Sequence, residues 1–495
     1  MAVLLGIDIG TTTIKTAVVD ADVLAAAERE HPMHQPRPGW AEQNPDDWWA
    51  GVIDTTRRAL ADSGVDPGSV CGIGLSGQMH TGPYLGADGR PLRPAVIWAD
   101  TRSSPQVDEL RRRASLAEMA CHAPGLPAAG YMAPVLMWMA LHEPETLAKM
   151  RVFLLPKDYV RLRLTGQIAT EPSDAAATWL FDVAAGDWSD WLIDRCGLER
   201  RYTPPVVESA AVVGGLLPAA AAALGLRAGT PVVGGCADMT AQALGHGLYE
   251  PGRALVIVGT GGQVFHAMTA PTVDPQLRFY VYNHAVPGRW YAQAAILTAG
   301  LSLRWLRDLL GLRDQPDAYQ RLSRLAAEVL PGAEGLVFLP YLGGERTPHM
   351  DPAASGVFLG LRLHHGPGHL ARAVMEGVAF AMADCLELAA PPGTAVIASG
   401  GATRSPVWQQ IMADVFGQPL LLSAGAHHAC VGNALLAGIG VGLYADAAAA
   451  TARLPKPEAA VAPDPATTDL YRERRALYRG LYGRLKDDMH ALRGQ

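Results

Sequence analysis

The chain has 495 residues, of which 49% are hydrophobic and 18% charged, and its formal net charge is -7. A single hydrophobic core rarely extends beyond about 250–300 residues, so this length predicts two domains. The mild acidity, with no cluster of lysine and arginine to reverse it, argues against a surface for nucleic acid or for an anionic membrane.

The cysteines and the chain start indicate the compartment. No C-x-x-C pair and no histidine at zinc spacing accompanies any cysteine, which predicts reduced, mostly buried thiols. No signal peptide precedes Ile7-Asp8, and the most apolar stretch, residues 211–226, contains Gly214, Gly215 and Pro218 and is shorter than a membrane span. We therefore expect a soluble, cytoplasmic protein. The six cysteines are Cys71, Cys121, Cys196, Cys236, Cys385 and Cys430.

The first element predicted is a hairpin. Residues 4–10 and 14–20 each have the pattern of a buried strand, and three threonines, residues 11–13, interrupt them. Such a Gly/Thr tip can turn backbone N–H groups and hydroxyls toward phosphate oxygens, and Asp8 lies close enough to hold a hydrated divalent cation. An ordinary hairpin without a ligand is the competing interpretation of this stretch.

A helix and two short strands follow. The pattern of residues 44–60 predicts a helix with an Asn cap. Residues 70–75 predict a strand, and Gln78 and His80 follow its C-terminal end. Open sheets place ligand-binding residues at this position, so both side chains could bind a polar substrate, although a purely structural histidine explains His80 equally well. After the next strand, Trp98 could stack on the apolar face of a sugar.

The middle of the chain holds the main catalytic candidate. Residues 230–245 predict strand, turn and helix, with Asp238 at the head of the helix. One interpretation makes Asp238 the helix N-cap, and the other makes it a general base that a substrate reaches past two glycines. The earlier pairs Lys157-Asp158 and Ser173-Asp174 show no self-evident chemistry.

The hairpin pattern returns in the second half. Residues 254–258 lead into Gly259-Thr260-Gly261-Gly262 and out through residues 263–265, which suggests an internal duplication and favours phosphate binding. A strand near residue 337, a helix over 369–384 and a strand over 396–399 follow. The last of these strands leads into Gly400-Gly401, where a nucleoside pocket could form, and then into a helix near residue 408. Residues 470–485 predict an amphipathic helix.

Taken together, these motifs resemble the FGGY carbohydrate kinases over nearly the whole chain and in the family's order. The motifs that carry the resemblance are residues 6–11, Gly77-Gln78-Met79-His80, residues 156–159, Asp238, Gly259-Thr260-Gly261 and residues 339–348.

The resemblance implies an α/β fold of two actin-like, ribonuclease-H-like domains, residues 1–245 and 246–495, with ATP in a cleft between them. It implies that the first domain binds sugar and carries Asp238 as the base, and that the second binds ATP. The implied substrate residues are Gln78, Met79, His80 and Trp98, beside Asp238. The implied cofactor residues are Thr11, Thr12, Lys15, Gly259, Thr260, Gly261, Gly400, Gly401 and Asn433, with Asp8 at Mg²⁺.

The family resemblance also implies a reaction, the ATP-dependent phosphorylation of a ketopentose, with D-xylulose as the expected substrate. Another ketose, gluconate or glycerol is the nearer alternative, and an actin- or chaperone-like ATPase is the more distant one. A homodimer is one expectation for the oligomeric state. The chain departs from the family pattern at Thr13, Cys236, Met239 and Asn433, which bears on nucleotide affinity and sugar choice.

Overall fold

The computed structural model describes residues 2–423 and 425–493, and the chain forms two compact units. The first unit comprises Met1–Tyr249, Met268–Tyr291 and Gly425–Leu454. The second comprises Glu250–Ala267, Ala292–Ala424 and Pro455–Gln495. The chain therefore returns twice to the first unit after residue 245, where the sequence predicts the domain boundary.

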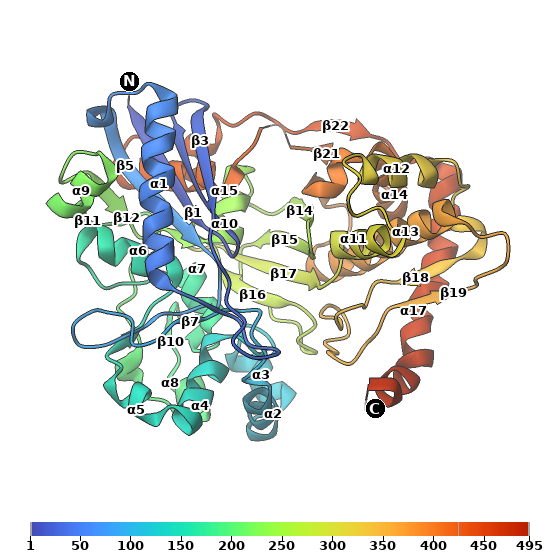
Figure 1. Ribbon diagram of the computed structural model, residues 1–495, viewed down its shortest axis with the longest axis horizontal. Helices are drawn as coiled ribbons and strands as arrows, with labels where there is room; N and C mark the ends of the chain where they lie inside the picture. The colour runs from blue at the N-terminus through green and yellow to red at the C-terminus, as the bar shows by residue number, and fades with distance from the viewer. Residues whose placement is uncertain (1, 424, 494–495) are drawn as a thin grey trace. The chain divides into compact units, whose positions relative to one another are not determined.

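The first unit is built on a mixed sheet that contains the predicted hairpin (Figure 1). β1 pairs antiparallel with β2 and parallel with β5, so the predicted strand–tip–strand unit is confirmed. The strand order is β11-β12-β5-β1-β2-β3, and β13 pairs with the end of β5. The strands are β1 (Val3–Ile9), β2 (Thr13–Val19), β3 (Val23–Glu30), β5 (Val70–Gly77), β11 (Val212–Gly215), β12 (Pro231–Val233) and β13 (Cys236–Ala237).

Helices cover both faces of this sheet. On one face, α1 (Pro45–Ser63), α6 (Pro156–Thr165) and α9 (Pro218–Leu224) pack on the odd-numbered residues of β1. On the other, α10 (Asp238–Gly245) and α15 (His428–Gly440) pack on Leu4. Because side chains alternate along a strand, the side chain of Asp8 points to the α10 and α15 face.

Two glycines of the sheet let α15 approach it closely. A Cβ at Gly6 would lie 1.8 Å from the carbonyl oxygen of Cys430, and a Cβ at Gly74 would lie 1.9 Å from that of Asn433. Neither strand could therefore carry a side chain at these positions with α15 in place. The late segment of the chain is thus part of the first unit's core.

Shorter elements complete the first unit. They include a helix that ends at His142, and Asn44 caps α1 through a hydrogen bond from the Asp46 N–H, as the sequence predicts. The elements are β4 (Glu42–Gln43), β6 (Tyr84–Leu85), β7 (Ala95–Val96), α2 (Ser104–Arg113), α3 (Leu116–His122), α4 (Met132–His142), α5 (Pro144–Lys149), β8 (Val152–Phe153), α7 (Pro172–Ala175), β9 (Phe181–Asp182), β10 (Asp187–Trp188), α8 (Asp190–Cys196), β16 (Tyr280–Asn283) and α16 (Ala447–Thr451).

The second unit repeats the arrangement of the first. β14 (Arg253–Val258) pairs antiparallel with β15 (Gly262–Met268) and parallel with β20 (Ala395–Ser399), which matches β1, β2 and β5 and confirms the predicted duplication. β20 continues to β21 (Leu420–Leu422) and β22 (Glu458–Val461). The remaining elements are β17 (Trp290–Ile296), α11 (Gly300–Leu309), α12 (Ala318–Ala327), β18 (Val337–Leu339), β19 (Val357–Leu359), α13 (Pro367–Ala389), α14 (Pro406–Phe416) and α17 (Pro465–Arg493).

Two expectations about the whole chain can be compared with the structure. All six cysteines are free thiols, and four of them are buried, which confirms the prediction. Among the described helices, none combines the length and apolarity that a membrane span needs.

Candidate functional site

Three neighbouring strands of the first unit bring the predicted acidic residues together. In the register of the sheet, Asp8 on β1 lies beside Ser76 on β5, and Ser76 lies beside Cys236 on β13. The Ser76 hydroxyl donates a hydrogen bond of 2.7 Å to Oδ1 of Asp8. Asp238 follows β13 directly, so both carboxylates lie at the same edge of the sheet.

Asp238 is the first residue of α10, and it is not the N-cap. The cap is Ala237, which has no side-chain hydrogen bond to offer, so the helix-cap interpretation of Asp238 is wrong. Asp238 as a residue is partly accessible. Burial, followed by the nearby charge of Asp8, raises its pKa to about 7. A carboxylate of that pKa is suited to accept a proton near neutral pH.

Asp8 has the features of a cation ligand. Burial raises the pKa of Asp8, while the hydrogen bond from Ser76 and the charge of Lys15 oppose the rise. The neighbouring Asp238 carboxylate adds a second negative charge, and a divalent cation would relieve this repulsion. No cluster of three or more potential metal-binding side chains occurs among the described residues. A hydrated Mg²⁺, which needs only one or two carboxylates, fits this pair of acids.

The side chain of Asn433 supports Asp8 from within the protein. Nδ2 of Asn433 donates 2.8 Å to the Ile7 carbonyl and 2.7 Å to the Ser76 hydroxyl, and the Cys236 thiol donates to Oδ1 of Asn433 at 3.6 Å. Asn433 is fully buried in the first unit. Its amide thus bonds to the sheet and to Ser76, and its predicted role in cofactor binding stays a prediction.

His80 is held in one orientation. It adopts a left-handed backbone conformation with φ of 69°, its Nδ1 lies 2.6 Å from the Ala177 carbonyl oxygen, and its ring stacks on Tyr131 with centroids 3.7 Å apart. Since a carbonyl only accepts, Nδ1 carries the proton, and in the neutral ring Nε2 is an acceptor. This nitrogen suits a hydroxyl donor.

Met79 connects the His80 loop to Asp238. The Tyr291 hydroxyl donates to Sδ of Met79 at 3.9 Å. Burial first, and then the charge of Asp238, raises the pKa of Tyr291, which places its ring near that carboxylate. Met79, His80 and Asp238 therefore lie in one region of the first unit.

Gln78 and Trp98 differ in their access to a ligand. Gln78 is buried, its Nε2 donates 2.7 Å to Gln43, and its Oε1 accepts from Thr81 at 3.4 Å. Both ends of the Gln78 amide thus have partners inside the protein, and its contact with substrate stays a prediction. Trp98 is exposed, and its indole N–H donates 2.9 Å to the Thr11 hydroxyl.

The first hairpin tip has its carbonyl groups fixed by the protein. The carbonyls of Gly10 and Thr12 accept from the ring and the backbone N–H of His31, and that of Thr11 accepts from Gln43. In the described part of the chain, the N–H groups of Thr11 and Thr12 donate no backbone hydrogen bond. Lys15, opposite Asp8 in the register, lies 3.6 Å from Glu28.

The second hairpin tip borders a hollow of about 750 Å³ in the second unit. The N–H groups of Ala299, Gly300 and Leu301, where α11 begins, bind the carbonyls of Gly259 and Thr260. Gly400 has φ of 92°, and a Cβ there would lie 2.6 Å from the Val258 carbonyl oxygen. The lining residues include Gly259, Thr260, Gly300, Gly401, Arg404 and Trp408.

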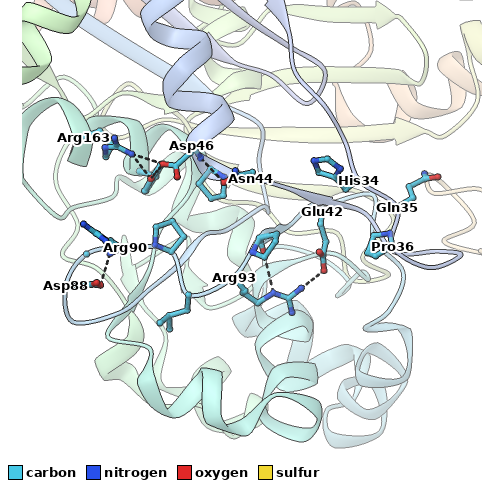
Figure 2. A pocket seen from close by; sticks show the side chains of 16 residues that line it. His34, Gln35, Pro36, Glu42, Asn44, Asp46, Asp88, Arg90, Arg93 and Arg163 are labelled. Atoms are coloured by element: carbon cyan, nitrogen blue, oxygen red, sulfur yellow. Dashed lines mark hydrogen bonds and ion pairs between the residues drawn. The ribbon is translucent and has the colours of Figure 1, made fainter.

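Another hollow, of about 1160 Å³, lies on the first unit beside α6 and contains none of the predicted site residues (Figure 2). Two of its arginines already pair with acidic residues that line it. Arg163 lies 2.9 Å from Asp46, and Arg93 binds Glu42. We therefore assign the candidate site to the Asp8 and Asp238 region and not to this hollow.

Sequence reasoning overlooked Ser76 and Asn433 as supports of Asp8. Ser76 could have been found from the strand register, because it follows a predicted strand at the same level as Asp8. Asn433 carries no comparable signal, since it lies 426 residues from Ile7 in the sequence.

Comparison with known proteins gives consistent results along the whole chain. The N-terminal domain of the FGGY family of carbohydrate kinases matches residues 3–245, and its C-terminal domain matches residues 254–441. A xylulose kinase of Escherichia coli (strain K12) is 37% identical over 487 residues, covering 97% of this chain and 99% of its own length. A xylulose kinase of Bacillus subtilis (strain 168) is 33% identical over 498 residues, covering 100% and 99%.

A solved structure agrees with these sequence matches. The crystal structure of xylulose kinase from Rhodospirillum rubrum is 32% identical, covers 99% of this chain and 100% of its own, and superposes with a TM-score of 0.90.

Proposed function

Because the chain belongs to the FGGY family of carbohydrate kinases, we propose that it transfers the γ-phosphoryl group of ATP to the terminal 5-hydroxyl of D-xylulose. The products are D-xylulose 5-phosphate and ADP. The observation that carries this proposal is Asp238, a partly accessible residue whose carboxylate has a pKa of about 7 beside Asp8. The similarity to xylulose kinases over the full chain supports the choice of sugar.

Asp238 is the general base of the proposed reaction. Its carboxylate accepts the proton of the 5-hydroxyl as that oxygen bonds to the γ-phosphorus, while the bond from this phosphorus to the bridging oxygen of ADP breaks. Phosphoryl transfer has a loose transition state, so alignment and charge stabilisation contribute most of the rate. The fixed position of Asp238 at the start of α10 provides that alignment.

Asp8 is the residue that would hold Mg²⁺. When bound, the cation neutralises charge that develops on the phosphate oxygens. Lys15 adds a positive charge opposite Asp8, and the tip residues Thr11 and Thr12 offer N–H groups and hydroxyls to the same phosphates. The hollow beside Gly259 and Gly401 is of a suitable size for adenosine, since ligand pockets span about 300–1,000 Å³.

The sugar end of the proposed site rests on His80 and Met79. Nε2 of His80 accepts a hydrogen bond from a sugar hydroxyl, while the stack on Tyr131 keeps the ring in place. Met79 supplies an apolar contact, and Trp98 covers the sugar from the hairpin side. A switch-type ATPase of actin or chaperone kind gives no role to this combination of groups.

A coupled assay of ADP release tests the proposal. The purified protein is offered xylulose, ribulose, gluconate, glycerol and fructose, each with MgATP, beside the Asp238→Asn variant. We expect the highest kcat/KM with xylulose and a loss of roughly 10²- to 10⁴-fold in kcat for Asp238→Asn. A higher kcat/KM with gluconate or glycerol would reassign the substrate, and ATP turnover that ignores every sugar would support the switch-type ATPase.

A further inference from the structure

Five charged side chains form a fully buried group on α6 and around the start of α7. Nζ of Lys157 lies 2.7 Å from Asp158, 3.4 Å from Glu171 and 3.3 Å from Asp174. Nη1 of Arg161 lies 2.8 Å from Asp158. We call this group the Lys157 cluster; its members are Lys157, Asp158, Arg161, Glu171 and Asp174, and none of their side chains is exposed.

The Lys157 cluster holds more acidic than basic side chains. Three carboxyl groups face two cations, and neither oxygen of Asp174 has a hydrogen-bond partner among the described residues. Burial raises the pKa of Asp174, against the opposing charge of Lys157. Replacing buried ion pairs with apolar residues is often neutral or stabilising, so folding stability alone gives no reason for such a cluster.

Arg161 connects the Lys157 cluster to the turn before Asp238. Its guanidinium donates to the carbonyl of Gly234, and the Cδ methylene of Lys157 packs against Gly235. Gly235 has φ of 84°, and a Cβ there would lie 2.4 Å from the Leu75 carbonyl oxygen. The turn is therefore enclosed between the sheet on one side and the cluster on the other.

Ser173 makes a second connection, one residue before Asp238. Its Oγ accepts a 2.9 Å hydrogen bond from the N–H of Ala237 and donates a 2.9 Å bond to Oε1 of Glu171. Glu171 also accepts from the hydroxyl of Ser209 at 2.7 Å, and the Ser209 carbonyl accepts from the N–H of Gly235. The backbone of Gly234, Gly235 and Ala237 is thus bonded to the cluster or to its partners.

We propose that the Lys157 cluster is a positioning device for Asp238, acting through Ser173 and Arg161 on residues 234–237. This inference rests on the proposed role of Asp238 as the base. The cluster touches neither sugar nor nucleotide. Its members are positioning residues, which fix the direction in which the Asp238 carboxylate meets the acceptor hydroxyl.

Ser173→Ala tests the proposal, because it removes the acceptor for the Ala237 N–H and leaves every ionised group in place. We expect kcat to fall by about 10- to 100-fold, as a misplacement of about 1 Å can cost 10²-fold. The Kd of the sugar and the KM of MgATP should stay within about two-fold, because the substrate-binding groups are unchanged.

Ser189→Ala is the matched control. Ser189 is also a buried serine whose Oγ accepts one backbone N–H, that of Leu192 at the start of α8. Each variant removes one side-chain acceptor of a backbone N–H, so both should show a similar small drop in Tm. Only Ser173→Ala should lose kcat. An equal kcat in the two variants would overturn the proposal.

Arg161→Lys is a second, independent variant. It keeps a positive charge near Asp158 but loses the guanidinium that donates to the Gly234 carbonyl. We expect it to lower kcat without changing the Kd of the sugar. Asp238→Asn separates the two proposals. Full turnover of Asp238→Asn would refute the role of Asp238 as the base. An inactive Asp238→Asn, together with an unchanged kcat in Ser173→Ala and Arg161→Lys, would refute the positioning role alone.

Discussion

The two carboxylates of the candidate site make the folded protein sensitive to pH. The ordinary pKa of Asp238 is 3.8, and in the folded protein it is about 7. Between these values the folded state binds a proton that the unfolded state has lost, so this group makes stability fall as pH rises. The resulting decrease in the free energy of unfolding is complete above pH 7 and amounts to at most about 4 kcal/mol.

Asp238→Asn should therefore stabilise the protein in alkaline solution while it removes activity. We expect a higher Tm than that of the parent protein at pH 8, with an advantage that shrinks as pH falls from 7 toward 4. Thermal unfolding across this pH range, followed by fluorescence, measures it. A variant less stable than the parent at pH 8 would mean that the Asp238 carboxylate is well solvated or stabilised by partners.

His80→Ala should affect the sugar and spare the nucleotide. Loss of the ring leaves a sugar hydroxyl without its acceptor, at a cost of about 1 to 3 kcal/mol, which is roughly a 5- to 150-fold rise in the KM of the sugar. The KM of MgATP should hardly change. Initial rates with each substrate varied in turn separate the two constants, and a rise in the KM of MgATP alone would place His80 elsewhere.

The elements that the local sequence predicts correctly are the hairpins and the helices next to them. The strand–tip–strand units, the capped helix α1 and the strand–turn–helix around Asp238 were predictable because each depends on neighbours in sequence. The hydrogen-bond partners of Asn433 and Gln78 inside the protein were not predicted. A motif gives the identity of a polar side chain, but its partners, such as Ser76 for Asn433 and Gln43 for Gln78, come from distant strands.

Variants of the two hairpins should act on the phosphate end of the reaction. Asp8→Ala removes the proposed cation ligand, and Thr260→Val removes a hydroxyl at the second tip. We expect each to raise the KM of MgATP by about 10-fold or more, the cost of roughly one charge-assisted hydrogen bond, with the Kd of the sugar nearly unchanged.

Thr394→Val is the control for the hairpin variants. It removes a hydroxyl that donates to the carbonyl of Pro391, outside the tips, and should leave both constants unchanged. Steady-state rates at several Mg²⁺ concentrations provide the measurement. Normal MgATP kinetics in both Asp8→Ala and Thr260→Val would refute the assignment of the tips to phosphate.

The chain's two units are discontinuous in sequence, and this has a consequence for folding. The first unit takes its helix α15 from residues beyond 425, and the backbone of α15 fits against Gly6 and Gly74. Residues 1–249 alone keep α10 but lack α15, and would expose the part of this sheet face that α15 covers, including Leu4. Burial of a leucine contributes about 1.5–3 kcal/mol, and several such side chains would be exposed together.

We therefore expect a fragment of residues 1–249 to remain insoluble or partly folded when it is produced alone. A second fragment of residues 1–291, which restores the segment from 268 to 291 but still lacks α15, should behave no better. Co-expression of residues 1–249 with residues 250–495 supplies α15 in trans and should recover soluble protein. Solubility, circular dichroism and dye binding to exposed apolar surface compare the three preparations, and a monomeric, cooperatively unfolding 1–249 fragment would contradict the role of α15 in this core.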